Sequence, residues 1–109
     1  MCIKFIGKIN NDDVLGQTSG IIICGAGSML DKLVYHLKER KLYNRVRAIA
    51  DNDPAKWGTE INGVVVQSYN ELVEKYSDLD YIVYNYYSKD IFYQLVKEKI
   101  NNIHLIRNL

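Results

Sequence analysis

A glycine-rich turn at residues 25–28 has the residue types best suited to binding chemistry. It follows an apolar run and precedes a helical pattern. Gly25 can adopt backbone angles that other residues avoid, and Gly27 has no side chain to block a phosphate. Free amides at the start of the next helix would meet that phosphate at the positive end of the helix dipole. We therefore expect a nucleotide-type ligand to bind at Gly25, Ala26, Gly27, Ser28 and Met29.

The turn departs from the full G-x-G-x-x-G fingerprint of dinucleotide-binding proteins at its last glycine, where Leu30 stands. That glycine lets helix and strand pack closely, so Leu30 indicates a wider spacing or a differently placed phosphate. Asp31 adds negative charge to the first helical turn and would weaken phosphate binding if it faced the ligand. A plain, tight strand-to-helix connection is the alternative interpretation of this turn.

A cluster of short polar residues, Asp51, Asn52 and Asp53, follows the second predicted strand. Asp51 lies 24 positions after Gly27 (51 − 27), and an acid near this place hydrogen-bonds a ribose hydroxyl in dinucleotide-binding folds. It would repel a ribose 2′-phosphate, which favours NAD over NADP. The same three residues are also turn formers before Pro54, and the two roles are compatible.

A third loop is rich in aromatic residues, with four tyrosines between positions 81 and 87. We expect Asn85 and Tyr86 to face the ligand, where an aromatic ring stacks on a base or a sugar. The alternative is that Tyr81 and Tyr84 fill the core while Tyr86 and Tyr87 cover an edge. Exposed tyrosines are also typical of protein interfaces.

Catalytic machinery is not recognisable in the chain. There is no nucleophile elbow and no cluster with metal-ligand spacing, and neither His36 nor His104 has an obvious partner. Within the expected binding crevice, candidate acids and bases occur only among Asp51, Asp53 and the tyrosines. We therefore predict no catalytic residue and no metal site, and a domain that is not catalytic on its own.

Composition narrows the class of protein further. The chain has 109 residues, 48% hydrophobic and 25% charged, which suits one folded domain and not a disordered chain. A formal net charge of +1 argues against nucleic-acid binding. Two cysteines are too few for a disulfide framework, no apolar segment is long enough to span a membrane, and no signal-peptide pattern is present. These features predict a cytoplasmic protein.

Strand-like and helix-like segments alternate from residue 21 onward. Strands are predicted at residues 21–24, 45–50, 64–66, 81–84 and 103–106 from their short apolar runs. Three helices are predicted from apolar residues at helical spacing. They start near Ser28, after a Ser68 capping box and after a Ser88 cap.

This alternation predicts an α/β, three-layer Rossmann-like fold with a parallel five-stranded sheet in the order 3-2-1-4-5. The reversal of strand order would place the binding crevice between strands one and four, beside the first and third loops. We expect residues 1–19 to form an N-terminal arm that packs on the sheet edge or on a partner. Residues 20–109 would form the nucleotide-binding domain.

Two motifs carry a family resemblance: Cys24-Gly25-Ala26-Gly27-Ser28, and residues 51–66, which read D-N-D-P-A-K-W-G-T-E-I-N-G-V-V-V. Over residues 20–106 the chain resembles the Rossmann-like domains at the N-terminus of bacterial polysaccharide-biosynthesis enzymes. These are sugar acyl- and acetyltransferases, nucleoside-diphosphate-sugar dehydratases and FkbM-like methyltransferases. We expect none of the catalytic domains of those enzymes within residues 1–109.

The resemblance implies a module that binds NAD(P) or a nucleotide sugar and leaves the reaction to a neighbouring domain. Gly25, Gly27 and Ser28 would hold the phosphate, and Asp51 and Asp53 the ribose or base side. A homodimer or a partner enzyme domain would be its protein contact. The alternative is a ligand-free interaction or oligomerisation module that keeps the fold for its surface.

Overall fold

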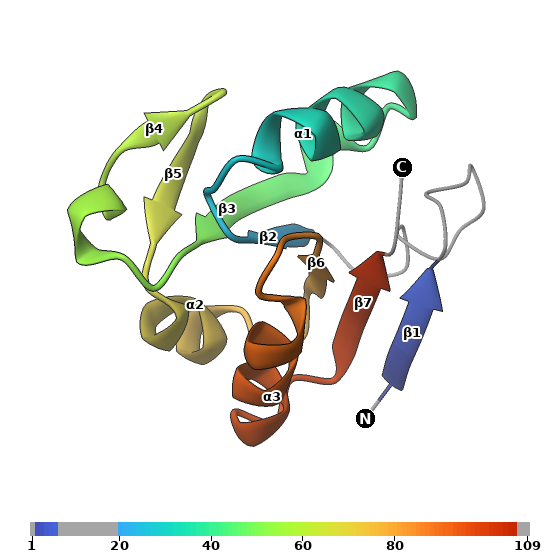
Figure 1. The fold of residues 1–109 in the computed structure, drawn as a ribbon, viewed down its shortest axis with the longest axis vertical. Helices are drawn as coiled ribbons and strands as arrows, with labels where there is room; N and C mark the ends of the chain where they lie inside the picture. Colours follow the sequence, from blue (N-terminus) through green and yellow to red (C-terminus); the bar gives the residue numbers. More distant parts are fainter. Residues whose placement is uncertain (1, 7–19, 107–109) are drawn as a thin grey trace.

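The computed structural model describes residues 2–6, as backbone alone, and residues 20–106. In these residues a seven-stranded sheet runs in the order β1-β7-β6-β2-β3-β5-β4 (Figure 1). Neighbouring strands are parallel except β4 and β5, which are antiparallel. The strands are β1 (Cys2–Ile6), β2 (Ile21–Cys24), β3 (Val46–Ala50), β4 (Glu60–Ile61), β5 (Val64–Gln67), β6 (Asp80–Val83) and β7 (Asn102–Ile106).

Helices cover both faces of this sheet, with α1 on one side and α2 and α3 on the other (Figure 1). The helices are α1 (Leu30–Glu39), α2 (Tyr69–Lys75) and α3 (Ser88–Lys97), and two 3₁₀ turns are η2 (Tyr43–Arg45) and η3 (Pro54–Lys56). No helix in the described part of the chain is long and apolar enough to cross a membrane.

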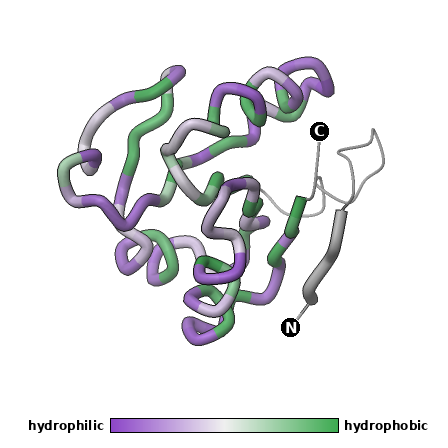
Figure 2. The backbone as a smooth tube through the Cα atoms, viewed as in Figure 1, coloured by the Kyte–Doolittle hydropathy of each residue, from purple (hydrophilic) through white to green (hydrophobic). Residues whose placement is uncertain are grey.

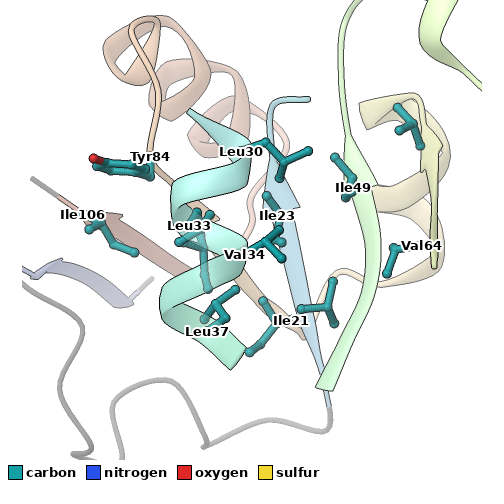
Figure 3. Packing of buried hydrophobic residues seen from close by; sticks show 13 residues of the cluster. Ile21, Ile23, Leu30, Leu33, Val34, Leu37, Ile49, Val64, Tyr84 and Ile106 are labelled. Carbon is teal, nitrogen blue, oxygen red and sulfur yellow. The ribbon is translucent and has the colours of Figure 1, made fainter. Parts of the chain in front are cut away.

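Strand β2 is buried on both faces, which explains its continuous apolar sequence. Ile21 and Ile23 pack with α1 on one side, where Leu33 and Leu37 meet them (Figure 3). The alternate residues of β2, Ile22 and Cys24, pack with α2 and α3 on the other side. Figure 2 shows that hydrophobic and hydrophilic residues also alternate along the helices, as expected for helices with one buried face.

The predicted α/β architecture is confirmed, with its three layers, but the predicted sheet of five parallel strands is incomplete. Strands β5, β3, β2, β6 and β7 stand in the predicted relative order 3-2-1-4-5. Two further strands extend this sheet. Strand β1 pairs with β7 at the sheet edge, one of the two places expected for the N-terminal arm, and β4, which was not predicted, pairs antiparallel with β5. The sequence signal for β4 is Asn62-Gly63, whose positive φ angles of 51° and 81° suit a tight hairpin turn.

The backbone of residues 2–6 lies in the sheet, as strand β1. Residues 7–19 lie outside the described part of the chain, so the division into an arm and a domain at residue 20 stays a prediction.

The starts of two helices test the predicted caps. Ser68 caps α2 as predicted, because its side chain accepts a hydrogen bond from the Glu71 amide. The prediction of a Ser88 cap is wrong: Tyr87 is the N-cap residue of α3, and the Ser88 hydroxyl donates to the Asn85 carbonyl instead.

Candidate functional site

A pocket of about 640 Å³ lies where the loops after β2, β3 and β6 meet. These three strands are adjacent and parallel, with β2 in the middle, so their carboxyl ends open on the same edge of the sheet. This is the point where the strand order reverses, and its volume lies within the range of small-molecule sites. The lining residues are Gly25, Gly27, Ser28, Met29, Asp51, Asn52, Asp53, Lys56, Tyr69, Asn85, Tyr86, Tyr87, Asp90 and Ile91.

The first loop, which follows β2 and contains Gly25, closely contacts the third loop, which follows β6 and contains Asn85. This contact requires a glycine at position 25. Gly25 has a φ of 105°, and its amide donates to the Ala50 carbonyl at 2.6 Å. A Cβ atom at this position would lie 2.7 Å from Nδ2 of Asn85. The same Nδ2 donates to the Cys24 carbonyl at 2.8 Å, and Oδ1 of Asn85 accepts the Tyr87 amide at 2.8 Å. Asn85 therefore fastens the β6 loop to the end of β2.

The start of α1 presents free backbone donors to the pocket. A Cβ atom at Gly27 would meet no atom within 4 Å, so the backbone there is open to a ligand. Met29, the N-cap residue, makes no side-chain capping bond. Among the described residues, the amides of Gly27, Ser28 and Met29 have no hydrogen-bond acceptor. Three donors without an acceptor at the positive end of a ten-residue helix are an arrangement that can hold an anion.

Asp51 connects the first loop to the second loop, which follows β3 and begins with residues 51–53. Its Oδ2 accepts the Ala26 amide at 2.8 Å, and its Oδ1 accepts the Asp53 amide at 2.8 Å. Its backbone carbonyl accepts the indole N–H of Trp57 at 2.7 Å. The side chain is 15% exposed. Both carboxylate oxygens thus hold backbone, and Asp51 shapes the loops around the pocket.

Lys56 is a lining residue that the sequence analysis did not select. Its Nζ donates to the Ala26 carbonyl at 3.1 Å and lies 4.0 Å from Oδ2 of Asp51, and its side chain is 40% exposed. It places one positive charge beside the free amides of α1. Its position in the D-N-D-P-A-K motif, five residues after Asp51, was the available signal.

The second loop also forms the wall of the pocket towards α3. The side-chain amides of Asn52 and Gln94 donate to each other's oxygens at 3.1 Å. Asp53 caps η3, because its Oδ1 accepts the Ala55 amide at 3.0 Å. This loop is therefore tied to α3 on one side and continues into η3 on the other.

Three tyrosines occupy different depths of the pocket. Tyr86 and Tyr87 stand on its rim, 80% and 70% exposed, where their rings are free to stack on a ligand. Tyr69 is 2% exposed, and burial raises the pKa of its hydroxyl far above the ordinary range. Tyr81 and Tyr84 do not line the pocket and belong to the core, as the alternative interpretation of this loop predicted.

The His104–Asp80 pair and the Cys24 thiol are ionisable groups that do not line the pocket. His104 and Asp80 form a fully buried pair with 2.7 Å between Nε2 and Oδ1, so the expectation that His104 lacks a partner is wrong. The pairing of β6 with β7 brings the two side chains together, which no local pattern in the sequence reveals. Cys24 is buried, and the loss of solvation raises the pKa of its thiol, so it is an unreactive core residue.

The structure brings together the residues that the sequence analysis selected. All of them line the pocket except Ala26, whose amide and carbonyl are held by Asp51 and Lys56. Lining residues that were not selected come from η3, α2 and the start of α3: Lys56, Tyr69, Tyr87, Asp90 and Ile91. Lys56 and Tyr87 are close in sequence to residues that were selected, whereas only the tertiary arrangement places Tyr69, Asp90 and Ile91 at the pocket.

Comparison with known proteins identifies a family for the chain. The family model described as the CoA binding domain matches residues 16–107. No curated protein and no solved structure matches the chain significantly. The polysaccharide-biosynthesis families suggested by resemblance are not confirmed, whereas the Rossmann-like fold is. Because the match spans most of its length, the chain belongs to the CoA binding domain family.

Proposed function

We propose that the chain binds a diphosphate-containing nucleotide of the CoA or NAD class across the carboxyl ends of β2, β3 and β6. The observation that carries this proposal is the open start of α1. There, the amides of Gly27, Ser28 and Met29 have no acceptor among the described residues and face a pocket large enough for a nucleotide. Family membership supports a nucleotide-type ligand.

In the proposed complex, phosphate oxygens accept hydrogen bonds from these three amides. The α1 dipole and the ammonium group of Lys56 add favourable electrostatic energy. Lys56 currently bonds to the Ala26 carbonyl and approaches Asp51, and its exposed side chain leaves it able to turn towards a phosphate. Charge complementarity therefore exists at one end of the pocket.

The other end of the pocket suits an uncharged sugar and base. Of the three carboxylates that line the pocket, that of Asp51 lies 4.0 Å from the ammonium group of Lys56 and holds two backbone amides, whereas those of Asp53 and Asp90 have no ion pair among the described residues. A ribose with an additional phosphate would meet this negative potential, so we propose that NAD binds better than NADP, and dephospho-CoA better than CoA. We assign Asn52 and Asp53 to the ribose side and the exposed rings of Tyr86 and Tyr87 to stacking.

A thermal-shift screen against CoA, dephospho-CoA, NAD, NADP and UDP-glucose tests the proposal, because a ligand that binds only the folded state raises the melting temperature. Trp57 is the one tryptophan of the chain and donates to the Asp51 carbonyl at the pocket, so its fluorescence gives dissociation constants for the same ligands. UDP-glucose also tests the proposed link to sugar or polysaccharide biosynthesis, which rests on the resemblance alone. Absence of any shift at millimolar ligand would contradict nucleotide binding.

Gly27→Asp is the variant that locates the phosphate. The added side chain has room to fold, since no atom lies within 4 Å of the Cβ position, but its charge would occupy the anion site. We expect binding to fall by at least about a hundredfold, which corresponds to roughly 2.7 kcal/mol. Gly27→Ala controls for the added volume, and Asn101→Asp adds the same charge at an exposed position before β7. Unchanged affinity in Gly27→Asp would remove the phosphate from this loop.

A protein-interaction role is the second candidate. It is favoured by exposed tyrosines at the pocket rim and on α3: Tyr86, Tyr87 and Tyr93 are 80%, 70% and 58% exposed. Size-exclusion chromatography with light scattering, in the absence of nucleotide, tests it. A dimer that Tyr86→Ser with Tyr87→Ser dissociates would support an interface at the rim, whereas a monomer at high concentration would contradict self-association.

A further inference from the structure

Tyr69, which lines the pocket, has a buried hydroxyl group without a strong hydrogen-bond partner in the described residues. Tyr69 is the first residue of α2, and its ring packs in the core between the sheet and the helices α2 and α3. Its hydroxyl oxygen is inaccessible to solvent and makes no hydrogen bond to nitrogen or oxygen in the described residues. Only the thiol of Cys24, a weak hydrogen-bonding group, lies within reach.

An unused hydroxyl group in this position costs stability. Burial removes the water that would solvate the group, and nothing replaces that water. Tyr81, on the same side of the sheet, shows the usual solution: its hydroxyl group is shared between the Leu72 and Tyr76 carbonyls, at 3.0 Å each. A phenylalanine ring at position 69 would fill the same space without the cost.

We propose that the Tyr69 hydroxyl group donates a hydrogen bond to an uncharged acceptor on the bound nucleotide, and so selects the nucleoside part of the ligand. This inference rests on the proposed nucleotide binding. Tyr69 lines the pocket together with Asp51, which follows β3, and it packs in the same buried cluster as Cys24, the last residue of β2. Because the hydroxyl oxygen is closed to solvent in the ligand-free structure, the pocket floor must open as the ligand binds, and the ligand then supplies the partner that the chain does not.

The surroundings of the hydroxyl group decide the chemistry of the acceptor. The nearby carboxylate of Asp51 acts electrostatically on the hydroxyl group, so an anionic acceptor would be repelled. Phosphate groups also have a better place at the amides of Gly27, Ser28 and Met29. The acceptor is therefore a sugar hydroxyl or a ring or carbonyl atom of the base. Burial raises the pKa of Tyr69, which keeps its proton available for donation.

Tyr69→Phe tests this assignment, because it deletes the hydroxyl group and keeps the ring. We expect the affinities for NAD and CoA, measured by Trp57 fluorescence and calorimetry, to fall by about tenfold. Inorganic pyrophosphate, which reaches only the α1 amides and Lys56, should bind both proteins equally. The melting temperature of the ligand-free variant should equal or exceed that of the wild type, since an unpaired buried group has been removed.

Tyr81→Phe is the matched control. It removes a hydroxyl group that has two acceptors and lies outside the pocket, so the melting temperature should fall while the nucleotide affinities stay unchanged. Equal NAD and CoA affinities in wild type and Tyr69→Phe would overturn the inference and leave nucleotide binding intact. A lower melting temperature of ligand-free Tyr69→Phe would also overturn it, because the hydroxyl group would then serve the fold. No binding of any nucleotide by the wild type would overturn both proposals.

Discussion

Asp51 bonds to the protein's own backbone with both carboxylate oxygens, and this changes what its charge does at the pocket. The sequence position of Asp51 predicts a contact to ribose. In the structure the carboxylate instead joins the Ala26 amide to the Asp53 amide, and the Asp51 carbonyl holds Trp57. We therefore expect Asp51 to support the phosphate loop from behind, with the same effect on every ligand that uses the loop.

Asp51→Asn tests this role. An asparagine has one acceptor oxygen, and its NH₂ group would face a backbone N–H donor, so one bond is lost and one donor is left without its acceptor. We expect the free energy of unfolding to fall by about 1–3 kcal/mol. The affinities for NAD and NADP should fall by the same factor, because the loop and not the ribose has been disturbed. Urea denaturation and Trp57 fluorescence measure the two effects.

Asp53→Asn is the control for Asp51→Asn. Asparagine caps a helix as well as aspartate does, so the bond to the Ala55 amide survives and stability should change by less than about 0.5 kcal/mol. A change in the NAD to NADP affinity ratio in Asp51→Asn would show that this carboxylate contacts the ribose after all.

At the scale of elements, capping distinguishes the helices. Ser68 caps α2 with its side chain, and Asp53 caps η3. The N-cap residues of α1 and α3, Met29 and Tyr87, make no side-chain capping bond, and both line the pocket. The absence of a cap leaves donors at the start of α1 to a ligand, whereas the cap on α2 serves stability.

Ser68→Ala should therefore destabilise the protein through α2. The Ser68 oxygen accepts the Glu71 amide at 3.2 Å, and its loss leaves that donor without its partner. We expect a decrease of about 1 kcal/mol in the free energy of unfolding, measured by urea denaturation. Ser77→Ala, at an exposed turn residue, should leave stability unchanged. A Ser68→Ala protein as stable as the wild type would show that the cap contributes nothing.

How well each element could be predicted depended on how local its signal is. The apolar run of β2 and the capping box of α2 lie within a few neighbouring residues and were predicted. Strand β4 has two residues, Glu60 and Ile61, and therefore no periodicity to detect. The Ser88 cap was wrong because α3 already begins at Ser88 and the Ser88 hydroxyl group bonds to the amide and carbonyl of Asn85 instead, a contact set by the loop.

At the scale of the whole molecule, topology made the pocket predictable. Alternating strands and helices imply a parallel sheet, and the reversal of strand order locates the crevice. Side chains brought to the pocket from distant segments were not predictable in this way. Lys56 lies in η3 and Tyr69 in α2. Their position near the first loop depends on the strand order β2-β3-β5, in which β3 lies beside β2 and β5 beside β3. The His104–Asp80 pair is hidden for the same reason.

The buried ionisable groups of the sheet also make the stability of the whole molecule depend on alkaline pH. Burial raises the pKa of Cys24 above its ordinary 9.0 and that of Tyr69 above its ordinary 10.0. The unfolded chain releases these protons first, so above pH 9 it binds fewer protons than the folded chain does. Their contribution is complete below pH 9 and is lost as the pH rises, by about 1.4 kcal/mol per pH unit for each group that is ionised only in the unfolded chain.

Tyr69→Phe separates the tyrosine's share of this alkaline loss from the rest. The free energy of unfolding, from urea denaturation between pH 8 and pH 10.5, should fall less steeply in the variant than in the wild type. The slopes should differ by about 0.7 kcal/mol per pH unit at pH 10, where half of the unfolded chains have ionised this tyrosine, and by about 1.0 at pH 10.5. Tyr86→Phe is the matched control, because an exposed tyrosine ionises alike in both states and should leave the slope unchanged. Equal slopes in Tyr69→Phe and wild type would mean that the Tyr69 hydroxyl group reaches solvent before the protein unfolds, through an opening of the pocket floor.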